Sequence, residues 1–98
     1  MASFKDIINS PKPVLVDFAA EWCRPCQMMK PILQELKSKL GDDVTIITID
    51  VDRNLDTAHA YSIMSVPTLM IFKNGQSVWR QSGIIKAEQL ASIIKRYK

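Results

Sequence analysis

The sequence predicts an α/β fold in which a mixed sheet is covered by helices on both faces. Segments rich in β-branched residues alternate with segments whose apolar residues recur at helical spacing. An Asn-Gly pair then separates the last two expected strands, and a closing helix follows them. The 98 residues, 47% of them apolar, can build one hydrophobic core, so we expect a single domain over residues 1–98.

Local signals place the elements of the first half of the chain. Ser3 and Asp6 match a capping box, which begins a short helix that ends before Asn9. The apolar run at 14–18 predicts a strand. After the cysteines, apolar residues fall at helical spacing as far as Leu40, and the glycine that follows is placed where a helix ends.

The elements of the second half are predicted in the same way. Residues 44–49 are β-branched throughout, which is typical of a buried strand. A weaker helical pattern covers about 53–62. Strands at 69–72 and 77–80 flank the Asn-Gly pair, which supplies the positive φ angles of a tight primed turn. An apolar stripe over 87–97 predicts the closing helix.

Composition and charge argue against several classes of function. The net charge is only +3, and basic residues near the end are balanced by aspartates in the middle, so we expect no nucleic-acid partner. The first ten residues hold no apolar run of the signal-peptide kind, and no segment reaches the length of a membrane span. We therefore expect a cytoplasmic monomer that has no membrane partner.

Cys23 and Cys26 are the only cysteines, and they lie where the first strand leads into the long helix. In open α/β sheets, the functional residues usually lie at the carboxyl ends of the strands. A structural disulfide between them would close a loop of about four residues and stabilise the fold by roughly 2 kcal/mol, before any strain in the folded chain is subtracted. In a reducing cytosol the two thiols would also stay reduced. A purely structural disulfide therefore explains the cysteine pair poorly.

A metal site is the second interpretation of the cysteine pair. A structural zinc usually takes four Cys or His ligands, and this chain adds only His59 to the two cysteines. Two chains could pool their pairs around zinc or an iron–sulfur cluster, so this alternative stays open. For the chain itself we expect neither a metal nor another cofactor.

Disulfide exchange has positive physical support. The attacking species is the thiolate, and an ordinary cysteine with a pKa near 8.5 is only a few per cent thiolate at neutral pH. Lowering that pKa by about 1.5 units takes roughly 2 kcal/mol, which the helix start and the adjacent cation of Arg24 can supply. Pro25 fits the first helical turn. We expect Cys23 to be the exposed nucleophile and Cys26, one turn deeper, the resolving thiol.

Asp17 is hard to explain by folding alone, because an ionised carboxylate is expensive to bury in an apolar strand. Strand alternation places it on the face of Leu15, opposite Val16 and Phe18. If that face lies under the long helix, Asp17 has a raised pKa and can exchange a proton with Cys26. The alternative is a strand-end residue bonded to nearby backbone.

An ordered set of motifs resembles the thioredoxin family. The run 16–26 (VDFAAEWCRPC) and Pro31 match its active-site segment. Residues 66–68 (VPT), 72–75 (FKNG) and Gly83 follow in the right order and at the right spacing. The resemblance covers nearly the whole chain. It implies a three-layer thioredoxin fold and a protein-disulfide reductase, an electron donor in cell redox homeostasis that acts on protein disulfides.

The resemblance also implies roles for individual residues. Cys23 and Cys26 would form the redox-active disulfide, which a reductase, expected to be an NADPH-dependent thioredoxin reductase, reduces again. Pro67 would be a cis-proline that faces the cysteines, and the backbone of Val66 would pair with the substrate. The docking patch is expected to consist of Trp22, Val66, Pro67 and Gly83. Ordinary core packing of the tryptophan and a plain turn at the glycine are the alternatives.

Three departures from the family pattern bear on function. Arg24-Pro25 replaces the usual Gly-Pro, and its cation should stabilise the reduced form and make the disulfide a stronger oxidant. Thr48 stands where many thioredoxins carry a lysine, so Asp17 should ionise less easily. The family's first strand has no counterpart, so we expect about four strands, with 44–49 as an exposed edge.

These departures leave two alternatives to an electron-donating reductant. The first is a more oxidising disulfide oxidase or isomerase, which the cation of Arg24 favours. The second is a non-catalytic subunit that binds another protein through the same patch.

Overall fold

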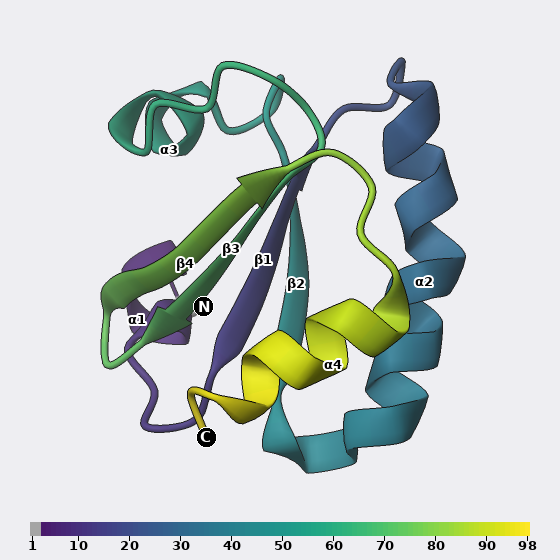
Figure 1. Ribbon diagram of the computed structural model, residues 1–98. Helices are drawn as coiled ribbons and strands as arrows, with labels where there is room; N and C mark the ends of the chain where they lie inside the picture. The colour runs from purple at the N-terminus through teal and green to yellow at the C-terminus, as the bar shows by residue number, and fades with distance from the viewer. Residues whose placement is uncertain (1–2) are drawn as a thin grey trace.

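The central layer of the protein is a mixed sheet (Figure 1). The computed structural model describes residues 3–98, and its strands are β1 (Val14–Ala19), β2 (Thr45–Asp50), β3 (Thr68–Lys73) and β4 (Gln76–Ser82). Their order in the sheet is β2-β1-β3-β4. β1 is parallel to β2 and antiparallel to β3, which forms a hairpin with β4. The predicted set of strands is confirmed.

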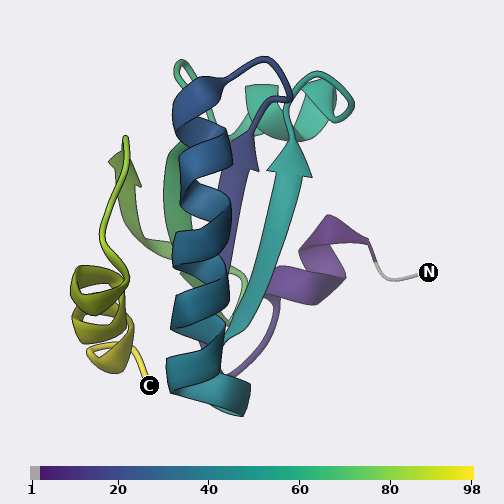
Figure 2. The same ribbon diagram turned by 90° about the vertical axis from the view of Figure 1, so that its right-hand side faces the viewer.

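Helices form the two outer layers. The structure has α1 (Phe4–Ile8), α2 (Arg24–Leu40), α3 (Leu55–Ala60) and α4 (Ala87–Lys95), and a 3-10 turn at Gly41–Asp43 follows α2. Figure 2 shows that α2 and α4 cover one face of the sheet, whereas α1 and α3 lie on the other. The three-layer architecture expected from the resemblance is therefore present.

Strand β1 separates two hydrophobic clusters because its side chains alternate between the faces of the sheet. Leu15 packs with the buried residues of α2 and α4. Val16 and Phe18 pack on the opposite face, against Phe4 of α1 and Tyr61 beyond α3. All six residues of β1 are buried, as its central position requires. The predicted sidedness of this strand is confirmed.

Turn and cap signals account for most of the element boundaries. Ser3 and Asp6 form a reciprocal capping box at the start of α1. Gly41 ends α2 with a φ of 54°, a conformation that glycine adopts without steric cost. Asn74 and Gly75 both have positive φ between β3 and β4, as a primed hairpin turn requires.

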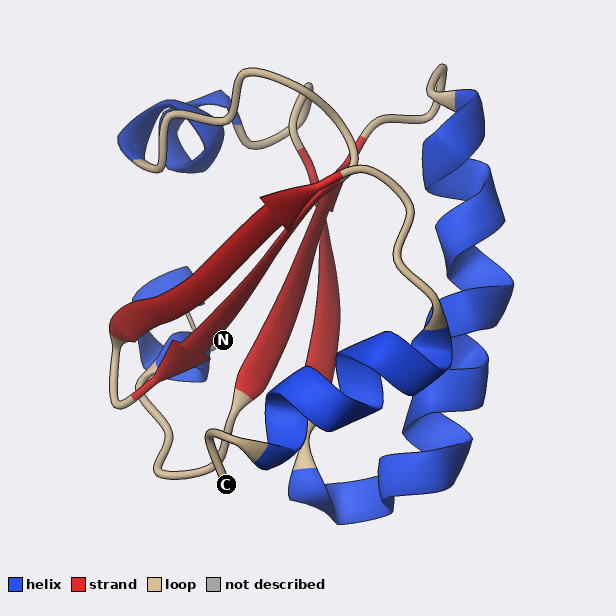
Figure 3. Ribbon diagram, in the orientation of Figure 1, coloured by secondary structure: helices blue, strands red, loops and turns tan. Residues whose placement is uncertain are grey.

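The prediction of a buried strand at 44–49 is wrong, whereas the prediction of an exposed edge is confirmed. Val44 is buried, but the residues of β2 are half-buried or, at Thr48, exposed. The reason is the strand order, because among residues 3–98 β2 pairs only with β1 (Figure 3). The predicted helices at 53–62 and 87–97 are also shorter, at Leu55–Ala60 and Ala87–Lys95. No helix within residues 3–98 combines the length and the apolar character that crossing a bilayer requires.

Candidate active site

The two cysteines lie where β1 gives way to α2, and they are joined by a disulfide. Cys23 is the N-cap of α2, with an extended backbone, and its Sγ accepts a hydrogen bond from the backbone N–H of Cys26 at 3.2 Å. Pro25 sits in the first turn, where its missing N–H leaves no helical hydrogen bond unmade. The positive end of the helix dipole is therefore directed at the sulfur of Cys23.

Both cysteines are buried in this disulfide form. Cys23 is 4% exposed and Cys26 is 2% exposed, and they pack with Ala19, Ala20 and Val66. The prediction that Cys23 is an exposed residue is thus corrected. A local pattern predicts that Cys23 lies at the start of a helix. Its burial depends on residues distant in the sequence, such as Val66, which pack against it.

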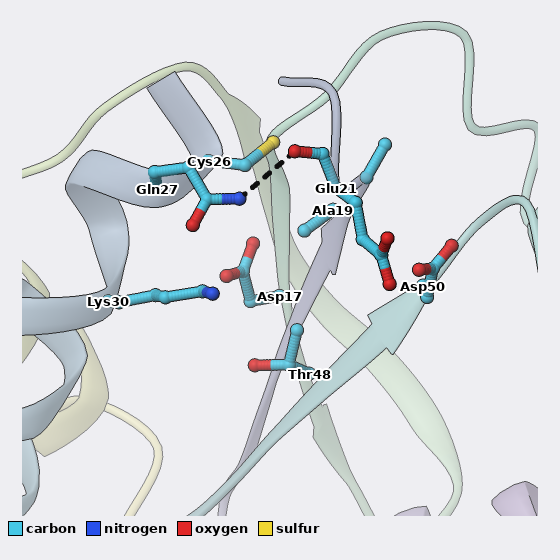
Figure 4. Close-up of a pocket in the computed structure, with 9 residues that line it drawn as sticks. Asp17, Ala19, Glu21, Cys26, Gln27, Lys30, Thr48 and Asp50 are labelled. Atoms are coloured by element: carbon cyan, nitrogen blue, oxygen red, sulfur yellow. Dashed lines mark hydrogen bonds between the residues drawn. The ribbon is translucent and has the colours of Figure 1, made fainter. Parts of the chain in front are cut away.

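Asp17 lies beneath α2, on the face that strand alternation predicted. It shares a cavity of about 150 Å³ with Cys26 (Figure 4), which is enough room for a few water molecules. Glu21, Gln27 and Lys30 also line this cavity. The remaining lining residues are Ala19, Ala20, Thr48 and Asp50. Cys26 and Asp17 therefore line one cavity that is partly open to solvent, so a proton can pass between them directly or through water.

Burial perturbs the Asp17 carboxyl group strongly. The residue is 1% exposed, and its Oδ1 has no hydrogen-bond partner among the described residues. Removal from water raises the pKa of Asp17 from 3.8 to about 6, because the charged form loses its hydration. The alternative interpretation, a strand-end residue bonded to nearby backbone, does not fit this unpartnered oxygen.

The loop before β3 approaches the disulfide. The Val66–Pro67 peptide is cis, as the resemblance implied, and the carbonyl oxygen of Val66 lies 3.6 Å from Cys23 Sγ. Gly83, with a φ of 93°, donates its N–H to the carbonyl of Pro67 at 2.9 Å. Val66 and Gly83 are half-buried, and Pro67 is buried. Val66 therefore lies against Cys23, and Gly83 is bonded to the next residue of the same loop, although these segments are distant in sequence.

Trp22 is 73% exposed, so ordinary core packing does not describe it. Its indole N–H donates to Oδ2 of Asp52 at 2.8 Å, which fixes the ring at the surface next to Cys23. An exposed aromatic side chain held in this way offers a flat apolar contact for another protein. The bond to Asp52 was not predicted, because it joins two loops whose proximity depends on the pairing of β1 with β2.

The remaining predicted residues have distinct places. Arg24 is the first residue of α2, and its side chain is exposed, so water weakens its effect on Cys23. Thr48 is the cross-strand neighbour of Asp17 on β2. Lys30 was missed, although it lies four residues after Cys26 and therefore on the same side of the helix. Residues 3–98 contain no group of three or more His, Cys, Asp or Glu side chains placed to hold a metal ion.

Comparison with known proteins decides the family. The family model for thioredoxin matches residues 1–96 of the chain. The chain belongs to the thioredoxin family. A thioredoxin-like protein of Synechocystis sp. is 49% identical over 90 residues, a match that covers 91% of this chain and 86% of that protein. A solved structure of a mutant thioredoxin from Halobacterium salinarum is similar with a TM-score of 0.86 at 36% identity, covering 95% of this chain and 80% of that one.

A longer relative carries a thioredoxin and a reductase in one chain. The bifunctional thioredoxin reductase/thioredoxin of Mycobacterium leprae is 40% identical over 92 residues, which span 94% of this chain and 19% of that protein. Family membership and the Cys23–Cys26 pair together make this thioredoxin-family chain a thiol–disulfide oxidoreductase. The resemblance and the fold drawn from the sequence are confirmed.

Proposed function

We propose that this chain reduces protein disulfides, with Cys23 as the nucleophile, Cys26 as the resolving thiol and Asp17 as the proton acceptor for Cys26. One observation carries the proposal. The Sγ of Cys23 sits at the amino end of α2, while Cys26 shares a cavity with the buried side chain of Asp17. The two thiols therefore have different surroundings, one suited to a stable thiolate and the other to proton transfer.

The first step is attack by the Cys23 thiolate on a substrate disulfide. One substrate sulfur leaves as a thiolate, and the other becomes bonded to Cys23 in a mixed disulfide. The N–H of Cys26 and the helix dipole stabilise the negative sulfur before attack. The attack removes the negative charge from the Cys23 sulfur, so the interactions that stabilise the thiolate are lost in this step. The thiolate must therefore remain nucleophilic although it is stabilised.

The second step releases the substrate. Cys26 gives its proton to Asp17, and its thiolate attacks the Cys23 sulfur of the mixed disulfide. The substrate leaves reduced by two electrons, and the Cys23–Cys26 disulfide is the oxidised product. A carboxyl group with a pKa of about 6 is ionised enough near neutrality to accept the proton and basic enough to hold it.

The substrate's extended segment docks on the patch formed by Trp22, Val66, Pro67 and Gly83. Support comes from the Val66 carbonyl, which lies 3.6 Å from Cys23 Sγ, and from the hydrogen bond that joins Gly83 to Pro67. The backbone of Val66 can pair with an extended peptide, as an added strand does. Trp22 adds apolar area at the rim of this patch.

The same proposal includes the electron donor of the chain, its oligomeric state and its cellular location. A thioredoxin reductase that draws electrons from NADPH returns the disulfide to the dithiol, and the fused relative of Mycobacterium leprae supports this pairing. The chain works as a single thioredoxin domain over residues 1–98, as a monomer in the cytoplasm, in electron transport to protein substrates.

The titration of Cys23 tests the proposal. In a reduced Cys26→Ser variant, the alkylation rate of Cys23 by iodoacetamide is expected to rise with a midpoint at least about one pH unit below the ordinary thiol value. The unfolded variant in guanidinium provides the control, since it lacks the helix end. Equal midpoints in the native and unfolded chains would contradict the proposed activation.

Arg24 favours a second candidate function, that of a more oxidising disulfide oxidase or isomerase. The cation lies next to Cys23 and stabilises its thiolate, and therefore the reduced form. Because the side chain is exposed, the effect is about 0.5–1 kcal/mol, which corresponds to roughly 10–20 mV.

Replacement of Arg24 tests this electrostatic effect. An Arg24→Gly variant is expected to have a reduction potential lower by about 10–20 mV, measured by equilibration with glutathione. Arg24→Lys keeps the charge and should keep the potential. A glycine variant with an unchanged or higher potential would show that the cation does not bias the disulfide toward oxidation.

A further inference from the structure

The proposed role of Asp17 raises an electrostatic problem. To accept a proton from Cys26, the carboxyl group must first be ionised, yet it is buried and its Oδ1 lacks a hydrogen-bond partner among the described residues. The neighbouring residue on β2 is Thr48, which brings no charge. A cation that faces the carboxylate from another element would make the ionised form easier to reach.

Three other charged side chains line the cavity that Asp17 shares with Cys26. They are Glu21 from the loop after β1, Asp50 from the end of β2 and Lys30 from α2. The two acids lie beside Arg53, whose Nη2 is 3.0 Å from Glu21 Oε1 and whose Nε is 4.0 Å from Asp50 Oδ2. Their negative charges are thus partly compensated at the mouth of the cavity.

Lys30 has no such partner. Among the ion pairs of residues 3–98, none joins its Nζ to a carboxylate within 4.0 Å. Lys30 is exposed and also lines a second groove with Leu33 and Thr48. Its ammonium group extends toward the Asp17 carboxylate (Figure 4). Because Lys30 follows Cys26 by four residues, the helix holds both side chains over the same cavity.

We propose that Lys30 is the counter-charge of Asp17, a positioning residue that keeps this carboxylate ionised for proton transfer from Cys26. The inference rests on the proposed role of Asp17 and deepens it. In this chain the cation comes from helix α2 and not from β2, where Thr48 stands. No ion pair within 4.0 Å joins Lys30 to Asp17, and the cavity of about 150 Å³ has room for water molecules that would bridge the two groups.

The charge balance of the step shows when Lys30 acts. Before the step, Asp17 is a carboxylate and Lys30 an ammonium ion, so the pair is neutral overall. When the Cys26 S–H bond breaks, its proton forms an O–H bond on Asp17, and the new thiolate sulfur inherits the negative charge. Lys30 then faces that thiolate across the same cavity until the sulfur attacks Cys23. The ammonium group therefore faces an anion on both sides of the proton transfer.

Removal of the ammonium group tests the inference directly. In the reduced protein, a Lys30→Met variant is expected to raise the midpoint of the Asp17 titration, followed by carbon NMR of the carboxyl group, by about half a pH unit, because Lys30 is exposed and water screens its charge. Starting from a pKa of about 6, this lowers the ionised fraction about twofold at pH 6 and hardly changes it at pH 8. Single-turnover release of a mixed disulfide should slow in the same proportion at the two pH values.

Matched variants separate this effect from a general loss of charge. Lys39→Met removes one positive charge from the same helix, at an exposed site paired with Glu35, and should leave the Asp17 titration unchanged. Lys30→Arg keeps the charge and should keep the wild-type pH profile. Adding Thr48→Lys to Lys30→Met places a cation across the strand pair from Asp17 and should restore the midpoint.

The outcomes distinguish this inference from the function on which it rests. An Asp17 midpoint that does not move in Lys30→Met, or that moves equally in Lys39→Met, overturns the role of Lys30 alone. If Asp17→Asn releases the mixed disulfide as fast as the wild type does, the proposed role of Asp17 fails. The NMR titration does not depend on turnover, so the two results are read separately.

Discussion

A Cys26→Ser variant is expected to accumulate a covalent mixed disulfide between Cys23 and protein substrates, whereas a Cys23→Ser variant should form none. The first variant keeps the thiol at the amino end of α2 and loses the group that resolves the adduct. The second keeps only Cys26, which lies within the first turn of α2 and lines the cavity with Asp17. Because each residue acts in a different step, both variants should lose at least about 1,000-fold in turnover.

The adducts can be measured on non-reducing gels after the reduced variants are mixed with a disulfide-containing protein. Mass spectrometry of the trapped peptide then identifies the bonded cysteine. The two variants control for each other, since each removes one sulfur, and circular dichroism reports whether both are folded. Adducts bonded to Cys26 in the Cys23→Ser variant, at a comparable rate, would reverse the proposed roles.

Replacement of Asp17 by asparagine is expected to stabilise the oxidised protein at pH 7 by up to about 3 kcal/mol. Burial raises the pKa of Asp17 from 3.8 to about 6, and each pKa unit corresponds to 1.36 kcal/mol. The ionised carboxylate is therefore unfavourable in the folded chain, and the neutral amide removes that cost. The same substitution should slow release of the mixed disulfide at least about tenfold, because it removes the proton acceptor.

The stabilisation by Asp17→Asn depends on pH in a defined direction. In the folded chain the carboxyl group binds its proton more tightly than in the unfolded chain, so ionisation favours unfolding. Relative to the variant, the wild type is therefore at its most stable below about pH 3.8. It loses that stability as the pH rises to about 6, and the difference is constant above this range.

Urea unfolding of both oxidised proteins at several pH values between 3.5 and 7.5 would measure this difference. Asp42→Asn, at an exposed site in the 3-10 turn, serves as the matched control. A difference between the wild type and Asp17→Asn that stays the same at pH 4 and pH 7 would mean that the carboxyl group is not perturbed by burial.

Local pattern was sufficient to place the main elements of this fold. The capping box of Ser3, the glycine after Leu40 and the Asn-Gly turn each act within a few residues, so their outcome does not depend on distant contacts. The position of Cys23 at the start of a helix followed from the same local signals, as did the sidedness of Asp17 on β1.

The features that the sequence did not predict depend on contacts between elements that are distant in the sequence. Residues 44–49 have the composition of a buried strand, but the residues on β2 are only partly covered because the strand lies at the edge of the sheet. Cys23 is covered by Val66, which is 43 residues away. Lys30 carries a local signal, its spacing from Cys26, but its direction toward Asp17 is visible only once α2 lies over β1.

The two edge strands of the sheet, β4 and β2, differ in the features that hinder pairing with another strand. β4 exposes polar side chains such as Gln76 and Arg80, and its pairing with β3 is interrupted by a register shift. Strand β2 has no proline and no bulge, and its only charge is Asp50 at its last residue. Charges, prolines and bulges are the features that usually discourage another strand from pairing with an edge. Within residues 3–98, the unpaired backbone N–H and C=O groups of β2 are therefore the place where an additional extended segment would join the sheet.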